Sequence, residues 1–133
     1  MILPILLLSI WSPPATCTAV DGDTLRCSEI GRVRLLGIDA PEMAGHCRKG
    51  RTCAPGDPVA SKKALEKLVA RGVTISPVTR DRYGRTVAQV YADDKNLACE
   101  QLRRGVAVYM QKWDNGGRLA KECRYAGPPQ RSR

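Results

Sequence analysis

A succession of short β-type segments separated by tight turns restricts the fold of this chain more than any other feature. The segments are rich in apolar and β-branched residues, and turns containing glycine or aspartate bound them. The sequence predicts five strands, over residues 16–20, 24–28, 32–38, 73–78 and 86–91. In the fourth strand, Pro77 favours an edge position or a bulge, because proline cannot donate to a neighbouring strand.

Three helices are expected beside these strands. Asp57 is predicted to cap the first helix, with Pro58 at its first position and Gly72 at its end. Its predicted apolar stripe comprises Ala60, Ala64, Leu65, Leu68 and Val69. A second helix is predicted from Asn96, its cap, through Arg104, and a short third helix over residues 118–125. The pattern matches an α+β fold, a small five-stranded OB-fold Greek-key barrel with about three helices.

With 133 residues, the chain has the length of one domain, which we expect over residues 16–127, followed by a flexible tail at 128–133. Residues 2–11 are apolar, and no charged side chain precedes Asp21. This run has the length of the apolar part of a signal peptide, so we predict a signal peptide at residues 1–15 and export to the periplasm or the medium. A hydrophobic first strand or a misplaced start codon is the alternative.

The six cysteines are an even and generous number for a chain of this size. In an exported protein they indicate disulfides, although six cysteines allow fifteen pairings. Local geometry favours Cys17 with Cys27 across the turn at Gly22, and Cys47 with Cys53 across one loop, which leaves Cys99 with Cys123. Zinc is the rival explanation because His46 adjoins Cys47, but no second pair with zinc-finger spacing completes four ligands.

The net charge of +9 indicates a polyanionic partner. Lys and Arg that neutralise phosphates release condensed counterions, so nucleic acid is the favoured partner, although basic surfaces also bind membranes. The chain has four Tyr, two Trp and no Phe, which argues against base stacking as the main mode of binding. We therefore expect contact through backbone phosphates, no stable membrane association after export, and a monomer.

Three carboxylates are candidates for one site. Asp39 and Glu42 leave the end of an apolar strand, with Pro41 fixing the backbone between them, and Asp23 begins the second strand. A hard cation such as Ca²⁺ takes six to eight oxygen ligands, so Asp23, Asp39 and the main-chain carbonyl of Ala40 suit it. Asp21 is interpreted as a turn residue only.

Two arginines accompany these acids. Arg34 lies in an otherwise apolar segment, where a buried guanidinium must find an anion. Arg85 follows the tight turn at Tyr83-Gly84. Taken singly, each fits a structural salt bridge or a solvated turn charge. Together beside a cation they would match phosphate oxygens and stabilise the charge that grows on phosphorus during attack.

Three segments in this order carry a specific resemblance. They are Asp21-Gly22-Asp23-Thr24, then Arg34-Leu35-Leu36-Gly37-Ile38-Asp39-Ala40-Pro41-Glu42, then Asp81-Arg82-Tyr83-Gly84-Arg85. From about residue 16 to 109 the chain resembles the staphylococcal (micrococcal) nuclease family, also called thermonucleases. The resemblance implies a calcium-dependent enzyme that cleaves single- and double-stranded DNA and RNA to products ending in a 3′-phosphate.

The resemblance also implies a role for each matching residue. Asp23 and Asp39 would bind Ca²⁺ through their carboxylates and Ala40 through its carbonyl, where the family often has Thr. Glu42 would be the general base, and Arg34 and Arg85 would hold the scissile phosphate. Tyr83 falls on a family tyrosine that contacts the nucleotide, and packing is the alternative for it.

The chain also departs from the family. Cys47 and Cys53 lie in a loop that has no cysteines in the type member, and the family's second nucleotide-contacting tyrosine has no counterpart in register, although Tyr109 and Trp113 are near. A module of the same fold that binds nucleic acid without cleaving it is the first alternative to a nuclease. A disulfide-stapled basic protein acting on membranes or proteins is the second.

Overall fold

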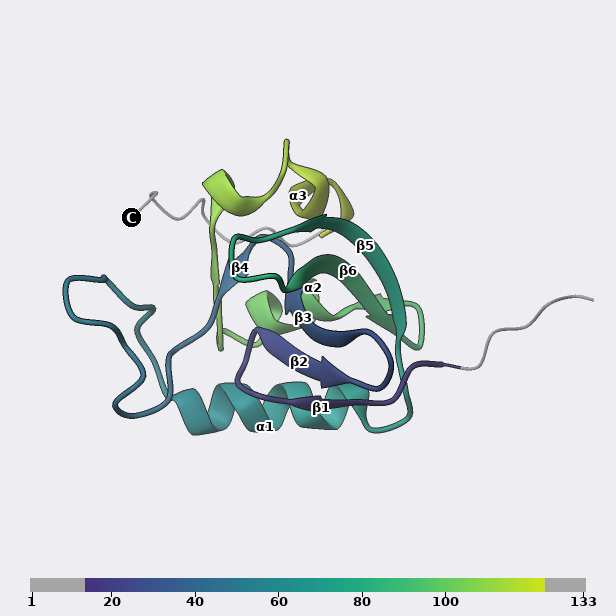
Figure 1. The fold of residues 1–133 in the computed structure, drawn as a ribbon, viewed down its shortest axis with the longest axis horizontal. Helices are drawn as coiled ribbons and strands as arrows, with labels where there is room; N and C mark the ends of the chain where they lie inside the picture. Colours follow the sequence, from purple (N-terminus) through teal and green to yellow (C-terminus); the bar gives the residue numbers. More distant parts are fainter. Residues whose placement is uncertain (1–13, 124–133) are drawn as a thin grey trace, which may run out of the picture.

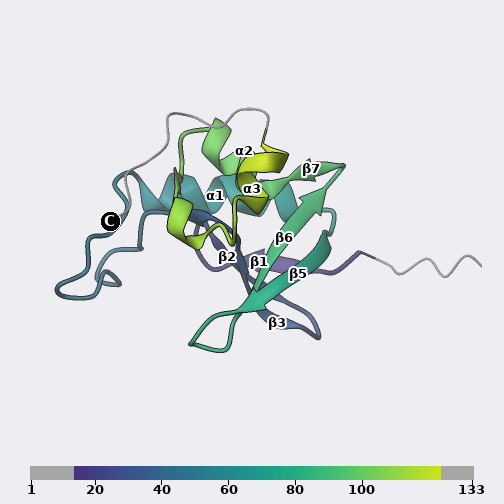
Figure 2. The same cartoon turned by 90° about the horizontal axis from the view of Figure 1, so that it is seen from above.

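The computed structural model describes residues 14–123 as an α+β domain (Figures 1 and 2). The strands are β1 Cys17–Ala19, β2 Thr24–Cys27, β3 Gly31–Leu35, β4 Ile38–Asp39, β5 Thr74–Arg80, β6 Thr86–Ala92, β7 Lys95–Asn96 and β8 Val108–Tyr109. The helices are α1 Pro58–Val69, α2 Leu97–Arg103, the 3₁₀ helix η1 Gln111–Trp113 and α3 Arg118–Glu122. The predicted α+β class is confirmed.

The main sheet has six strands, so the prediction of five was wrong. Its order is β1-β2-β3-β6-β5, with β7 paired to β6; β3 and β6 run parallel and the other pairs antiparallel. A separate two-stranded sheet joins β4 to β8. The predicted third strand is divided into β3 and β4 by a turn at Leu36-Gly37, where Gly37 has φ +79°, a conformation open to glycine.

The predicted OB-fold barrel is not closed in the structure. Within the described range, the outer edges of the sheet meet through one antiparallel bridge, in which Ala15 and Val73 exchange two backbone hydrogen bonds of 2.8 and 2.9 Å. On the β5 edge, the register shifts between Pro77 and Thr79. The predicted edge position or bulge at Pro77 is therefore confirmed.

The core lies between the sheet and the helices α1 and α2. Residues from all these elements are fully buried there, among them Leu25, Val33, Leu35, Leu65, Val90 and Leu97. Figure 1 shows α1 running along β1, and α1 also contacts α2. Burial of these side chains, roughly 1.5–3 kcal/mol each, is the main stabilising term.

The predicted helix caps are confirmed. The carboxylate of Asp57 accepts hydrogen bonds from the backbone of Val59 and Ala60, and the amide oxygen of Asn96 accepts from Ala98 and Cys99. The predicted apolar stripe of α1 was wrong at one place. Ala60 is exposed and Ser61 is buried instead, because its hydroxyl donates to the carbonyl of Val106 at 2.6 Å.

The turn between β1 and β2 is fastened to both helices. The buried side-chain amide of Gln101 in α2 donates to the carbonyls of Gly22 and Ser61, at 2.9 and 3.0 Å. A Cβ atom on Gly22 would lie 1.7 Å from the hydroxyl of Ser61, so only glycine permits this approach. These two hydrogen bonds from Gln101, called the Gln101 clamp below, fix the position of Asp23, the residue after Gly22.

All three predicted disulfides are present. Cys17 and Cys27 face each other across β1 and β2, Cys47 and Cys53 close a loop between β4 and α1, and Cys99 joins α2 to Cys123 at the end of α3. The third link anchors the end of α3, which ends at Glu122, so Cys123 does not belong to the helix predicted over residues 118–125. Residues 124 and 125 lie outside the described range.

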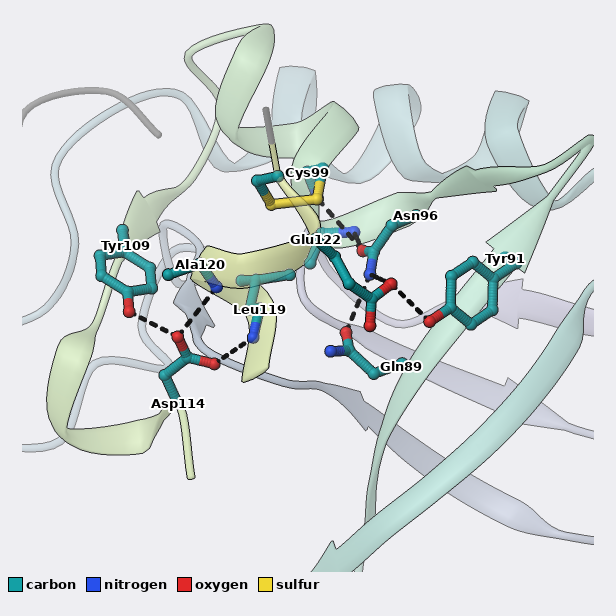
Figure 3. Close-up of a disulfide and its surroundings, with 11 residues drawn as sticks. Gln89, Tyr91, Asn96, Cys99, Tyr109, Asp114, Leu119, Ala120 and Glu122 are labelled. Atoms are coloured by element: carbon teal, nitrogen blue, oxygen red, sulfur yellow. Dashed lines mark hydrogen bonds between the residues drawn. A yellow bond between two sulfur atoms is a disulfide. The ribbon is translucent and has the colours of Figure 1, made fainter. Parts of the chain in front are cut away.

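Buried polar contacts hold the C-terminal region around the third disulfide (Figure 3). The carboxylate of Asp114 accepts from the backbone of Leu119 and Ala120 and from the hydroxyl of Tyr109. Burial, together with the hydrogen bond to Asp114, raises the pKa of Tyr109 to about 12. These contacts join β8 to the start of α3, and β8 in turn pairs with β4.

Most of the predicted signal peptide and the predicted tail at 128–133 lie outside the described residues. Ala15, the last residue assigned to the signal peptide, belongs to the bridge with Val73. None of the helices in the described range is both long and apolar enough to cross a membrane.

Candidate nuclease site

Arg34 lies at the centre of the candidate site. Its Nη1 is 3.4 Å from Oδ1 of Asp23, its Nη2 is 3.9 Å from Oδ1 of Asp39, and Nη2 also donates to the carbonyl of Ile38 at 3.0 Å. The cross-strand register explains the meeting, because Thr24 on β2 is opposite Arg34 on β3. The Leu36-Gly37 turn then brings Asp39 back toward Arg34. Three residues from the predicted site therefore converge.

Asp23 is held as a buried anion. Its Oδ2 accepts from the backbone of Ala40 at 2.8 Å, and its Oδ1 accepts from the hydroxyl of Thr24 at 2.9 Å. Burial alone would raise the pKa of Asp23, but Arg34 and these hydrogen bonds outweigh burial and hold the pKa below its usual value. The bond from Ala40 also ties the end of β4 to the start of β2, which fixes the main chain that leads to Glu42.

Glu42 joins the site through an arginine that the sequence analysis did not single out. Nη1 of Arg51 is 3.1 Å from Oε1 of Glu42, and Nη2 of Arg51 is 3.5 Å from Oδ1 of Asp39. Asp39 thus lies within 4 Å of two guanidinium groups, those of Arg34 and Arg51. Arg51 belongs to the disulfide-closed loop, where nothing in the sequence distinguished it from the neighbouring Arg48 and Lys49.

Asp21 is more than the turn residue that the sequence indicated. Its carboxylate does accept from the backbone of Asp23 at 3.0 Å, as a turn residue would. Burial, the charge of Asp23 and, to a smaller extent, the charge of Glu42 raise the pKa of Asp21 to about 7. Asp21 therefore belongs to the same acidic cluster as Asp23 and Glu42.

Arg85 lies in the neighbouring hairpin between β5 and β6. Its Nε is 2.6 Å from Oδ2 of Asp81, whose Oδ1 accepts from the backbone of Arg85 and of Tyr83. Parallel pairing places Arg34 of β3 beside Val87 of β6, two residues after Arg85, which directly precedes β6. Within residues 14–123, no hydrogen bond or ion pair joins Arg85 to Asp23 or Glu42, and its carboxylate partner is Asp81.

Tyr83 is 52% exposed and has three guanidinium groups around its ring. Those of Arg48, Arg82 and Arg85 lie 5.3, 5.1 and 5.5 Å from the ring centre. Hydrogen bonding from Arg82, reinforced by the charges of Arg82 and Arg48, lowers the pKa of the Tyr83 hydroxyl. Positive charge is thus concentrated at the tip of this hairpin.

Trp113 of η1 lies over Arg34, with the guanidinium carbon 5.1 Å from the ring centre. The sequence analysis noted Trp113 near the place of a family tyrosine but out of register with it. Only the packing of η1 shows the contact, because no local pattern links Trp113 to a residue 79 positions earlier.

The donors at this site are of the kind that hard cations prefer. Asp23, Asp39 and Glu42 offer only oxygen atoms, and two arginines face Asp39, which shows that the site attracts positive charge. Among residues 14–123, however, no three or more Asp, Glu, His or Cys side chains are arranged as a ready metal site. The donor set fits Ca²⁺ in its chemistry.

A comparison with known families identifies the chain. The family described as "Staphylococcal nuclease homologue" matches residues 32–127. The chain belongs to the staphylococcal nuclease family. The match includes Arg34, Asp39, Glu42 and Arg85, whereas Asp23 precedes it.

Individual relatives agree with this assignment. An uncharacterized endonuclease of Haemophilus influenzae is 36% identical over 118 residues, which cover 75% of this chain and 61% of the relative. An uncharacterized endonuclease of Escherichia coli O157:H7 is 35% identical in a match that covers 80% of this chain and 72% of the relative's length. A probable staphylococcal-like nuclease of Oryza sativa subsp. japonica is 34% identical in a match that covers 68% of this chain and 24% of the relative's length. The chain thus spans less than two thirds of the Haemophilus relative.

Proposed function

We propose that this protein is a calcium-dependent nuclease that hydrolyses phosphodiester bonds in single- and double-stranded DNA and RNA and leaves 3′-phosphates. The observation that carries the proposal is the convergence of Arg34 with the buried acids Asp23 and Asp39, to which Arg51 joins Glu42. The family and the endonuclease names of its relatives support the reaction class.

In the proposed mechanism, Asp23, Asp39 and the carbonyl of Ala40 would hold Ca²⁺, and the ion would supply positive charge to offset that of the scissile phosphate. Arg34 and Arg85 bind the oxygens of that phosphate and stabilise the charge that develops during attack. Glu42, whose side chain is 18% exposed, accepts a proton from the attacking water. Tyr83 contacts the nucleotide from the exposed tip of the β5–β6 hairpin.

Cleavage of plasmid DNA, with calcium and then with a chelator, tests the proposal. We expect cleavage only with calcium. Glu42→Gln and Arg85→Ala should lower turnover by about 100-fold or more while folding and DNA binding persist, because each removes an interaction made in the transition state. The matched control is Arg71→Ala, which removes an exposed arginine after α1. Unchanged turnover in both site variants would overturn the mechanism, and binding without any cleavage would favour the non-catalytic module.

The chemistry of the product is tested separately. A 5′-labelled oligonucleotide, as DNA or RNA and single- or double-stranded, is digested and then treated with a 3′-phosphatase. We expect all four substrates to be cut and every product to change mobility after phosphatase treatment, because each carries a 3′-phosphate. Products that phosphatase leaves unchanged would contradict this part of the proposal.

We further propose that the protein is exported and acts as a monomer. Three disulfides support export, since such bonds persist in oxidising compartments. Cell fractionation should find the protein in the periplasm or medium with residues 1–15 removed, as N-terminal sequencing would report. Light scattering should give the mass of a single chain, and a dimer mass would contradict the second point.

A further inference from the structure

The loop closed by Cys47 and Cys53 stands beside the site and points one side chain into it. Figures 1 and 2 show residues 40–57 as a long excursion from the body of the molecule between β4 and α1. Gly50 has φ +84°, and the backbone N–H of Arg51 donates to the carbonyl of Arg48 at 3.0 Å. This turn lies inside the disulfide ring, and it directs Arg51 back toward the acids.

The loop contacts both sides of the site. Arg51 reaches Glu42 and Asp39, and Arg48 reaches the hydroxyl of Tyr83 at 3.3 Å in the hairpin that carries Arg85. Lys49 is exposed between them. The two arginines are thus held by different partners, and the disulfide limits how far either can withdraw.

Arg51 faces the same oxygen that a cation would approach. Oδ1 of Asp39, whose side chain is 2% exposed, lies 3.5 Å from Nη2 of Arg51. A guanidinium and a divalent ion at one carboxylate repel each other, and the repulsion is strong where water is excluded. The charge of Arg51 therefore opposes the binding of a divalent ion at this carboxylate.

We propose that Arg51 is an internal counter-ion of this site, which competes with the divalent cation for Asp39 and Glu42 and so sets the calcium concentration at which the site fills. This inference rests on the calcium site of the proposed function. The Cys47–Cys53 disulfide keeps Arg51 near the acids and makes the competition effective. Arg51 thus stabilises the acidic cluster of the calcium-free protein at the expense of calcium affinity.

Calorimetric titration of calcium, without nucleic acid, tests the role of Arg51. Arg51→Ala should bind calcium with a Kd roughly three- to tenfold smaller than the wild type, the size expected of a partly exposed ion pair to a buried acid. Lys49→Ala removes the same charge from the same loop without the contact, and it should leave the Kd within about twofold. Arg51→Lys, which keeps the charge, should lie nearer the wild type.

The disulfide is tested by the double variant Cys47→Ser/Cys53→Ser. We expect its calcium Kd to be smaller than that of the wild type, as in Arg51→Ala, because the opened loop holds Arg51 less firmly near the acids. Adding Arg51→Ala to the double variant should then give a smaller further change than it gives in the wild type. Thermal unfolding gives a second measure. Arg51→Ala should lower the Tm of the calcium-free protein more than that of the calcium-loaded protein.

The outcomes separate this inference from the proposed function. A calcium Kd that is the same in Arg51→Ala, Lys49→Ala and the wild type would overturn the role of Arg51 and leave the calcium site in place. An unchanged calcium Kd with weaker DNA binding would overturn it and assign Arg51 to the substrate. If neither the wild type nor Arg51→Ala binds calcium, the cation site fails, and both proposals fail with it.

Discussion

Arg34 connects stability and function at the scale of single residues. It is the counter-charge for two acids whose side chains are almost completely buried, and in the proposed mechanism it also binds phosphate. Replacing a residue with both roles should therefore reduce both stability and activity. Its loss leaves carboxylates that are cut off from water and have lost a positive neighbour.

Arg34→Ala should lower the free energy of unfolding by about 3 kcal/mol in the presence of a chelator, because breaking a buried ion pair leaves an uncompensated charge. Calcium should restore part of the loss, since the ion supplies the missing positive charge. Urea unfolding with chelator and with calcium measures both effects. A loss below about 0.5 kcal/mol, the range of neutral surface changes, would contradict the role of Arg34.

The carboxylate of Asp81 leads to a prediction of how the stability of the protein depends on pH. Its partial burial opposes ionisation, but hydrogen bonds from the backbone and side chain of Arg85 outweigh burial and lower its pKa below the ordinary 3.8. A carboxyl with a lowered folded pKa stabilises the protein fully above the unfolded pKa and loses this effect as pH falls through the folded value. Asp81→Asn should therefore reduce stability by a constant amount above pH 5, and the difference should shrink below about pH 4.

Thermal unfolding of the wild type and of Asp81→Asn at pH 7, 5, 4 and 3 measures this difference. Asp94→Asn, in the exposed turn before β7, is the control. An Asp81→Asn difference that grows toward pH 3 would show that the sign is wrong.

At the scale of elements, the site depends on contacts that secondary structure alone does not provide. β2 begins at a turn whose carbonyl oxygen at Gly22 is bound by α2, and Ser61 of α1 is bound by the same amide group. Asp23 follows that turn directly. The two helices thus fix the first acid of the site, although neither helix contributes a side chain to it.

Gln101→Leu should destabilise the protein by about 1–3 kcal/mol, because it removes the side-chain donor to the buried carbonyl of Gly22 and to the carbonyl of Ser61 in α1. It should also weaken calcium binding, since the turn before Asp23 is released. Urea unfolding and calorimetry measure the two effects, and Arg104→Ala, exposed at the end of the same helix, serves as the control. Lost stability with unchanged calcium affinity would show that the clamp supports the fold but not the site.

At the scale of the whole molecule, the charge of +9 governs the approach of a polyanion. Arg34 lies on β3 beside β6, Arg85 directly precedes β6, and Arg48 and Arg82 lie by the ring of Tyr83 in the β5–β6 hairpin. We expect binding of double-stranded DNA, measured by fluorescence anisotropy in a chelator, to weaken with salt. The log–log slope should be about −2 or steeper, because each neutralised phosphate contributes about −0.9.

Arg34→Lys should leave that slope nearly unchanged, because a lysine also neutralises one phosphate. Arg85→Ala should make the slope shallower by about one. DNA binding that does not depend on salt concentration would contradict recognition through phosphates. It would instead favour contacts of the bases with the aromatic side chains Tyr83 and Trp113.

The sequence by itself predicted those features that depend on neighbouring residues. Asp57 and Asn96 were identified as helix caps, and Pro77 was predicted at an edge or a bulge, because capping and strand edges follow from local chemistry. Two disulfides were predicted from short loop closures, and the third was the pair that remained. The three motifs also indicated the family, which the comparison shows.

Only the tertiary structure decided how the strands and the site are completed. The break at Leu36-Gly37, the sixth strand of the open sheet and the burial of Ser61 depend on packing between segments distant in the chain. The same is true of Arg51 and Trp113, which meet the site residues through a loop and through η1. A charged residue in a polar loop has no local signature, because the partner that gives it a role is fixed only when the chain has folded.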